Sequence, residues 1–162
     1  AVAYAHERFW EEVHERWADF LDPERWRGVG TARLVAEVVR RYTRVSLSDE
    51  RSRAFLVELL GRRDTRLRER VRELDARIAS LMGRLLAERA DDLDHPRPRQ
   101  AAEEGFQRVL SAVRDHLLFG RLDHRLDAER LILSLTQMYG GMLGVDDRPG
   151  SYVDLVRLCV LR

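Results

Sequence analysis

The chain has 162 residues, of which 44% are hydrophobic and 35% are charged, and its formal net charge is +1. This length and balance indicate one soluble domain, and the near-zero charge excludes an overall field that would attract nucleic acid or a membrane surface. The single cysteine, Cys159, excludes an internal disulfide and suits a reducing compartment, and no apolar run is long enough to cross a membrane. We therefore expect a cytoplasmic protein without a membrane partner.

Apolar residues recur at helical spacing through the first 45 residues. They predict a first helix over about Val2–Leu21 and a second over about Thr31–Val45. The intervening Asp22-Pro23-Glu24 indicates a turn or a short helical start, because proline suits the first position of a helix. The second segment is rich in β-branched residues, so a strand is the alternative, but its spacing and length favour a helix.

Two further helices are predicted before the middle of the chain. One covers about Glu50–Leu60 and ends at Gly61, and a long one runs from Asp64 or Thr65 to about Ala90. The stretch from residue 62 to residue 77 holds seven arginines and four acidic residues, and such interleaved charge is typical of a solvated helix face. Residues 91–98, with two prolines, form the clearest linker.

The region from residue 99 to residue 144 carries two more helical patterns, Gln100–Phe119 and Ala128–Leu143, joined by the polar loop 120–127. A loop this short favours an antiparallel αα-hairpin. Two such hairpins from two copies of the chain would form a four-helix bundle, so we predict a homodimer. The predicted dimer interface comprises Phe106, Val109, Val113, Leu117, Leu131, Leu135, Met138, Tyr139 and Met142.

The final helix contains Gly140-Gly141, a pair that costs roughly 2 kcal/mol of helix propensity relative to alanine. Two interpretations stand: another backbone approaches closely there, or the helix frays ahead of Gly144 as its C-terminal cap. The tail, residues 146–162, ends in an apolar stretch that fits either a short helix or an added strand. Residues 1–145 are therefore predicted as one domain, followed by a tail of uncertain structure.

Catalytic and metal-binding motifs are sparse. Glu11-x-x-His14 matches half of a di-iron helix motif, but a bundle site needs a second pair and further carboxylates, and no second Glu-x-x-His exists here. The sequence contains no Gly-rich phosphate loop, no His-Glu-x-x-His and no Gly-x-Ser-x-Gly. Cys159 lies in an apolar run, which favours an inert thiol. We therefore predict no enzyme, no catalytic residue, no metal site and no cofactor.

Aromatic residues gather at one end of the chain, since eight of the twelve lie in the first 55 residues. Such rings either fill a core or form the walls of a cavity for an apolar or flat ligand. His14 lies on or beside the ring-bearing face of its helix, where a histidine is more often a core or rim residue than a ligand contact. The predicted ligand-binding residues are Trp10, His14, Trp17, Tyr42, Phe55, Met82, Phe106 and Leu110.

Three parts of the chain carry a resemblance to a known family. They are residues 63–71 (RDTRLRERV), the linker 94–98 (DHPRP) with Ala101-Ala102, and the segments 117–120 (LLFG), 126–131 (LDAERL) and 141–145 (GMLGV). In that order, they resemble the passage from the sixth to the seventh helix, the entry into the eighth helix, and the last hairpin of the C-terminal ligand-binding and dimerisation domain of TetR/AcrR-type bacterial transcriptional regulators.

The resemblance covers about residues 2–145 and implies an all-α bundle of about six helices that dimerises through its last two. It also implies a repressor, in which a small hydrophobic ligand held among the first five helices controls a separate N-terminal DNA-binding unit. Two departures stand out: the helix-turn-helix is absent from this chain, and the tail has no counterpart. The alternatives are a stand-alone helical binding protein or enzyme without a DNA partner, and a purely structural dimerisation domain.

Overall fold

The computed structural model describes residues 2–48, 50, 54, 65–119 and 124–145, and the regular structure of these residues is helical. The predicted all-α class is confirmed. The predicted helix over residues 50–60, Phe55 and the tail 146–162 lie outside the described residues. The described elements are α1 (Val2–Phe20), the 3-10 helix η1 (Pro23–Trp26), α2 (Thr31–Ser48), α4 (Thr65–Ala87), the 3-10 helix η2 (Ala90–Asp92), α5 (Pro98–Phe119) and α6 (His124–Leu143).

The helix ends differ from the predicted ones at three places. Helix α2 continues beyond Val45 to Ser48, and α4 ends at Ala87 because the chain then turns into η2. Helix α6 begins at His124 instead of Ala128. No glycine or proline lies between Arg121 and Ala128, so nothing in that stretch opposes an earlier helix start.

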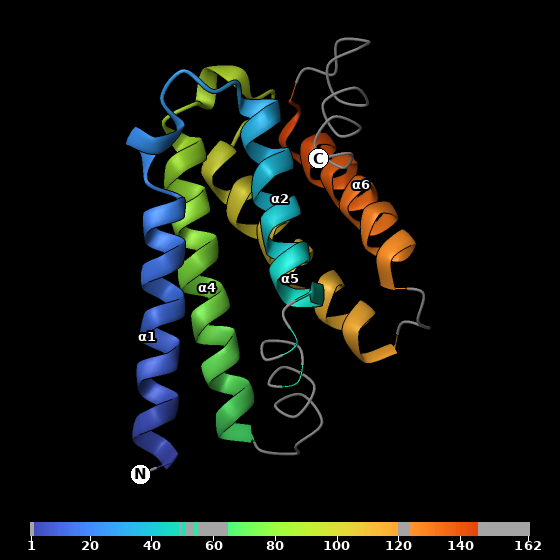
Figure 1. Cartoon of the computed structure of the whole chain (residues 1–162). Helices are drawn as coiled ribbons and strands as arrows, with labels where there is room; N and C mark the ends of the chain where they lie inside the picture. The colour runs from blue at the N-terminus through green and yellow to red at the C-terminus, as the bar shows by residue number, and fades with distance from the viewer. Residues whose placement is uncertain (1, 49, 51–53, 55–64, 120–123, 146–162) are drawn as a thin grey trace.

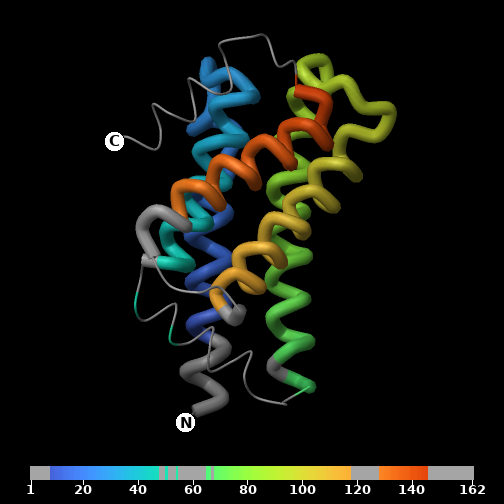
Figure 2. Tube along the Cα trace, turned by 90° about the vertical axis from the view of Figure 1, so that its right-hand side faces the viewer, coloured from blue at the N-terminus to red at the C-terminus, as the bar shows by residue number. Residues whose placement is uncertain are grey.

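Neighbouring helices of the bundle run mostly antiparallel (Figure 1). Helix α4 packs most extensively on α5, and α2 packs most extensively on α6. Helices α5 and α6 also contact each other, so the predicted hairpin exists, but each of its helices has a larger interface elsewhere in the chain. In Figure 2, the two helices of the hairpin lie across the remainder of the bundle instead of projecting from it.

Two aromatic side chains of the hairpin, Phe106 and Tyr139, are completely buried in the core. The Tyr139 hydroxyl donates a hydrogen bond of 2.8 Å to the carbonyl oxygen of Ala102. Gly105 makes this possible, because a Cβ there would lie 2.6 Å from the Tyr139 ring. The contact therefore fixes α6 against α5 through a ring that lies directly on backbone.

Much of the predicted dimer interface lies inside the protomer. Five of its residues have exposed fractions of 0–4%, so in this arrangement their side chains offer no surface to a second copy: Phe106, Val109, Val113, Leu135 and Tyr139. Met138 is 37% exposed, and Leu117, Leu131 and Met142 are partly exposed. The apolar stripes predicted for this hairpin thus pack mainly on the protomer's own helices.

Helix α6 passes through Gly140-Gly141 without interruption and ends at Leu143, so the predicted fraying is wrong. A Cβ at Gly141 would meet nothing within 4 Å among the described residues of the protomer, so the close approach of another backbone stays a prediction for a second copy. Gly144 is the predicted cap: its φ is +61°, and its N–H donates to the Gly141 carbonyl while the Val145 N–H donates to that of Gly140.

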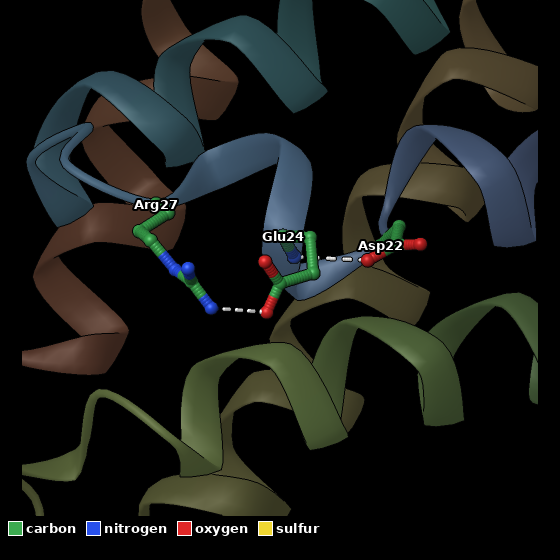
Figure 3. A network of polar contacts seen from close by, with 3 residues as sticks. All are labelled: Asp22, Glu24 and Arg27. Atoms are coloured by element: carbon green, nitrogen blue, oxygen red, sulfur yellow. Dashed lines mark hydrogen bonds and ion pairs between the residues drawn. The ribbon is translucent and has the colours of Figure 1, made fainter.

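The connection from α1 to α2 contains the short helical start that the sequence predicts, and a cap that was not predicted. The Asp22 side chain caps η1 by accepting a 2.9 Å hydrogen bond from the Glu24 N–H, and Arg27 pairs with the Glu24 carboxylate (Figure 3). Gly28 then adopts a φ of +77°, which turns the chain toward α2.

Polar contacts join this turn to the end of α4. Arg89 donates hydrogen bonds of 2.5 Å to the carbonyl oxygens of Trp26 and Val29. The Thr31 hydroxyl donates to Asp92, and the Asp94 N–H donates to the Gly144 carbonyl beside a bridge between Leu93 and Val145. We call residues 26–31, 89–94 and 144–145 the capped end of the bundle; it lies at the top in Figure 1.

Candidate functional site

A cavity of about 110 Å³ opens between α1, α2, α4 and α5. It is lined by α1 between residues 9 and 17, by the last turns of α2, by α4 between residues 71 and 78, and by one residue of α5. We call these stretches the pocket end; apart from the last turn of α1, they lie away from the capped end (Figure 1). The lining residues are Phe9, Trp10, Val13, Trp17, Tyr42, Val45, Ser46, Val71, Leu74, Asp75, Ile78 and Arg114.

Aromatic rings form the walls on the α1 and α2 side. Trp10, Val13 and Trp17 share one face of α1 because their spacing is 3 and 4 residues. The Trp17 ring lies 5.8 Å from the Tyr42 ring and 6.2 Å from that of Phe106, measured between centroids. The Phe9 and Trp10 rings meet edge to face at 5.5 Å. The walls are thus rings that support one another.

One ion pair lies in this otherwise apolar lining. Asp75 of α4 pairs with Arg114 of α5, and their side chains are only 15% and 14% exposed. Burial raises the pKa of Asp75 above its usual value, and the attraction of Arg114 opposes that shift only in part. The pair therefore carries two opposite charges into a site with little water, and each charge depends on the other.

Two hydroxyl groups lie close to this pair. Burial raises the pKa of Tyr42 to about 12, and the negative charge of Asp75 contributes in the same direction. Arg114 and a hydrogen bond with Ser46, one helical turn further along α2, act in the opposite direction. At neutral pH the cavity therefore holds a neutral phenol, a serine hydroxyl and an internally compensated ion pair.

The predicted ligand-binding residues do not all reach the cavity. Trp10, Trp17 and Tyr42 line the cavity, whereas Phe106 lies behind it with its ring against those of Trp17 and Tyr42. Met82 and Leu110 are fully buried core residues and do not line the cavity. Phe55 lies outside the described residues.

His14 is partly buried on α1 but is not part of the lining. Burial lowers its pKa, and the positive charges of Arg77 and Arg84 on α4 lower it further. The histidine thus faces arginines across the α1–α4 contact and is held toward its neutral form. His14 was predicted as a ligand-binding residue, with a core or rim position as the alternative, and it does not line the cavity.

The polar part of the site was not predicted from the sequence. Asp75 belongs to the charged stretch that predicts a solvated helix face, yet it follows Val71 by four residues and precedes Ile78 by three. Arg114 likewise follows Leu110 by four. Both charges therefore lie on inward stripes, and a charge on such a stripe is the signal that could have revealed them.

The part of the chain described by the structure offers no group of three or more histidine, cysteine or acidic side chains placed to hold a metal ion. Over the same residues, no helix has both the length and the apolar character needed to cross a bilayer. The site therefore consists of the ring-walled cavity and its ion pair.

Comparisons with models of protein families, with curated proteins and with solved structures found no match to this chain.

Proposed function

We propose that this chain is the effector-binding and dimerisation domain of a TetR/AcrR-type bacterial transcriptional regulator, which binds a small, mostly apolar molecule. The observation that carries this proposal is the ring-walled cavity between α1, α2, α4 and α5. The family resemblance of the sequence implies a ligand site among the first five helices, and the cavity lies among helices of that set.

The cavity supports ligand binding better than a purely structural role. Protein cores are packed as densely as organic crystals and contain few voids larger than a water molecule. A space of about 110 Å³, with apolar walls and a few polar groups, has instead the composition of a small-molecule site. The buried charges of Asp75 and Arg114 beside it would be a poor choice for stability alone.

Helix α1 is the proposed lever of regulation. It contributes Trp10 and Trp17 to the cavity wall, and in the family the corresponding helix connects the ligand site to the DNA-binding unit. A ligand shifts such a regulator only by its different affinity for two arrangements, and a coupling of roughly 1–3 kcal/mol is typical. Operator DNA would be bound by a separate N-terminal unit, and release would follow from movement of α1.

The proposed homodimer would use the outward side of α5 and α6. Met138 is the most exposed apolar residue of that side among the predicted interface residues, and Leu131 and Met142 are partly exposed beside it on α6. Native mass spectrometry tests this part by reporting subunit number and any co-purified compound together. A chain that stays monomeric at high concentration would contradict the dimer.

Ligand binding is tested with a matched pair of tryptophan variants. Trp17→Phe changes a cavity wall, whereas Trp26→Phe changes a buried indole at the capped end that hydrogen-bonds to the Phe20 carbonyl. Single-ring and two-ring aromatic compounds are screened by thermal shift, and affinities are then measured by calorimetry. We expect Trp17→Phe to weaken binding about fivefold through lost ring contact and Trp26→Phe to leave it unchanged.

Equal effects of the two variants would contradict the assigned cavity, and a screen without any binder would contradict the ligand-binding function. The regulatory part is tested on the natural gene product with operator DNA. The same ligand should release that DNA, with a weaker response in the Trp17→Phe protein. A ligand that binds the cavity without altering DNA binding would favour a helical binding protein without a DNA partner.

A further inference from the structure

We propose that the cavity selects an uncharged ligand of single-ring size that carries one hydroxyl group, such as an aromatic alcohol or a phenol. This inference rests on the proposed ligand site and specifies the chemistry that the site accepts. Three features of the lining lead to it: the volume, the compensated ion pair and the hydroxyl groups beside that pair.

The volume limits the ligand to about one aromatic ring. An engineered cavity of about 150 Å³ with apolar walls is large enough to bind benzene. The cavity here, at about 110 Å³, is somewhat smaller, and its border includes Phe9 and Val45, of which Val45 is 48% exposed. A single ring with a one-atom or two-atom substituent therefore fits the space, whereas a fused ring system would require the walls to separate.

The ion pair decides the charge of the ligand. Asp75 and Arg114 already neutralise each other, and both are mostly buried. An anionic ligand bonded to Arg114 beside Asp75 would give the site a net negative charge, and a cationic ligand bonded to Asp75 beside Arg114 would give it a net positive charge. Either arrangement leaves one charge without a counter-charge in apolar surroundings, which is strongly unfavourable.

The polar groups suit a ligand hydroxyl. The salt bridge joins Arg114 Nη1 to Asp75 Oδ2, so within the described residues Asp75 Oδ1 still offers acceptor capacity. The guanidinium carries five N–H donors, and the hydroxyls of Tyr42 and Ser46 lie in the same lining. A hydroxyl both donates and accepts, so it can bond to this group of atoms without breaking the pair. The raised pKa values of Asp75 and Tyr42 agree with a site that resists further negative charge.

Four ligands with the same ring test the proposal: benzyl alcohol, toluene, benzoate and benzylammonium. Their affinities for the unmodified chain are measured by calorimetry at neutral pH. We expect benzyl alcohol to bind most tightly, toluene to bind about tenfold more weakly because it leaves the polar groups unpaired, and both ions to bind more weakly than toluene. Tighter binding of either ion than of benzyl alcohol would overturn the proposal.

Variants of the pair change the expected ranking in opposite directions. Asp75→Asn leaves Arg114 without its counter-ion, so benzoate should gain at least about tenfold over benzylammonium. Arg114→Gln should favour benzylammonium by a similar factor. The double variant has no charge at either position, so it should restore the preference for benzyl alcohol. The control is Asp115→Asn, which changes an exposed residue of α5 outside the cavity and should leave the ranking of the four ligands unchanged.

The outcomes separate this inference from the proposed function. If the wider screen yields a cavity ligand but none of the four compounds binds, the inference fails and ligand binding stands. If no compound of any class binds, both fail. Circular dichroism checks the fold of each variant, and if a single variant does not fold, the ranking of the four ligands on the unmodified chain still decides.

Discussion

The two ends of this bundle are built in different ways. At the capped end, Arg89 bonds two backbone carbonyls, two glycines take positive φ angles, and hydrogen bonds join the α1–α2 connection, the α4–α5 connection and the end of α6. At the pocket end, aromatic rings surround an unfilled space and one buried ion pair. The residues that fix the connections between helices are thus separate from those that line the cavity, so substitutions at the capped end can be chosen that leave the lining intact.

The largest effect is expected from Arg89→Met. The substitution keeps much of the apolar stem but removes the charged donor that bonds the Trp26 and Val29 carbonyls. Losing such bonds should lower the free energy of unfolding by about 3 kcal/mol, measured by denaturant titration. Ligand affinity at the pocket end should not change. If the Arg89→Met protein were as stable as the parent, the bonds of Arg89 would not be what stabilises the capped end.

A pair of glycine variants gives the next largest effect. Gly144→Ala forces a Cβ into a φ of +61° and against the Asp94 carbonyl oxygen, so we expect a loss of about 2 kcal/mol. Gly141→Ala, three residues earlier, places its Cβ in open space within a helix and should stabilise by about 0.5–1 kcal/mol. Thermal unfolding of both variants measures the difference, and the same sign for both would contradict the assigned cap.

The smallest effect concerns pH at the pocket end. Tyr42 has an ordinary pKa of 10.0 that the fold raises to about 12, so the folded state holds the phenol proton more tightly than the unfolded state. Its contribution to stability is complete below pH 10 and is lost as the pH rises toward 12. At about pH 11 the loss should reach roughly 1.4 kcal/mol.

Tyr42→Phe is the control for that titration, since the variant keeps the ring and lacks the proton. Denaturant titrations at several alkaline pH values should show a steeper loss of stability in the parent than in Tyr42→Phe. Parallel curves would mean that the phenol is as accessible in the folded chain as in the unfolded one. The walls of the cavity would then be more open than the structure describes.

Periodicity and turn chemistry made most of the fold predictable. The inward stripes of α1, α2, α4 and α5, the cap at Asp22 and the glycine at residue 144 all follow from local rules. What a stripe packs against does not follow from such rules. The apolar stripe of α5, from which a dimer interface was predicted, instead packs on α4 and on Tyr139. Apolar spacing indicates that a helix face is buried, but it does not indicate which element covers that face.

The site was predictable only on its aromatic side. Trp10, Trp17 and Tyr42 could be found from their number and their helical spacing. Asp75 and Arg114 are 39 residues apart, and no local pattern links a charge on α4 to a charge on α5. Their pairing depends on how α4 and α5 are set against each other, which is a property of the packed bundle.

The aromatic rings of the cavity continue beyond it as a row. Trp17 and Tyr42 both touch Phe106, and Phe106 lies against Tyr139, with centroid distances of 5.8–6.3 Å along these contacts. Because close-packed rings cannot be compressed, a guest that pushes Trp17 aside must also displace the rings behind it. A guest beside α1 would therefore act on the position of α6. The effect would pass through directly packed side chains, with no solvent between them.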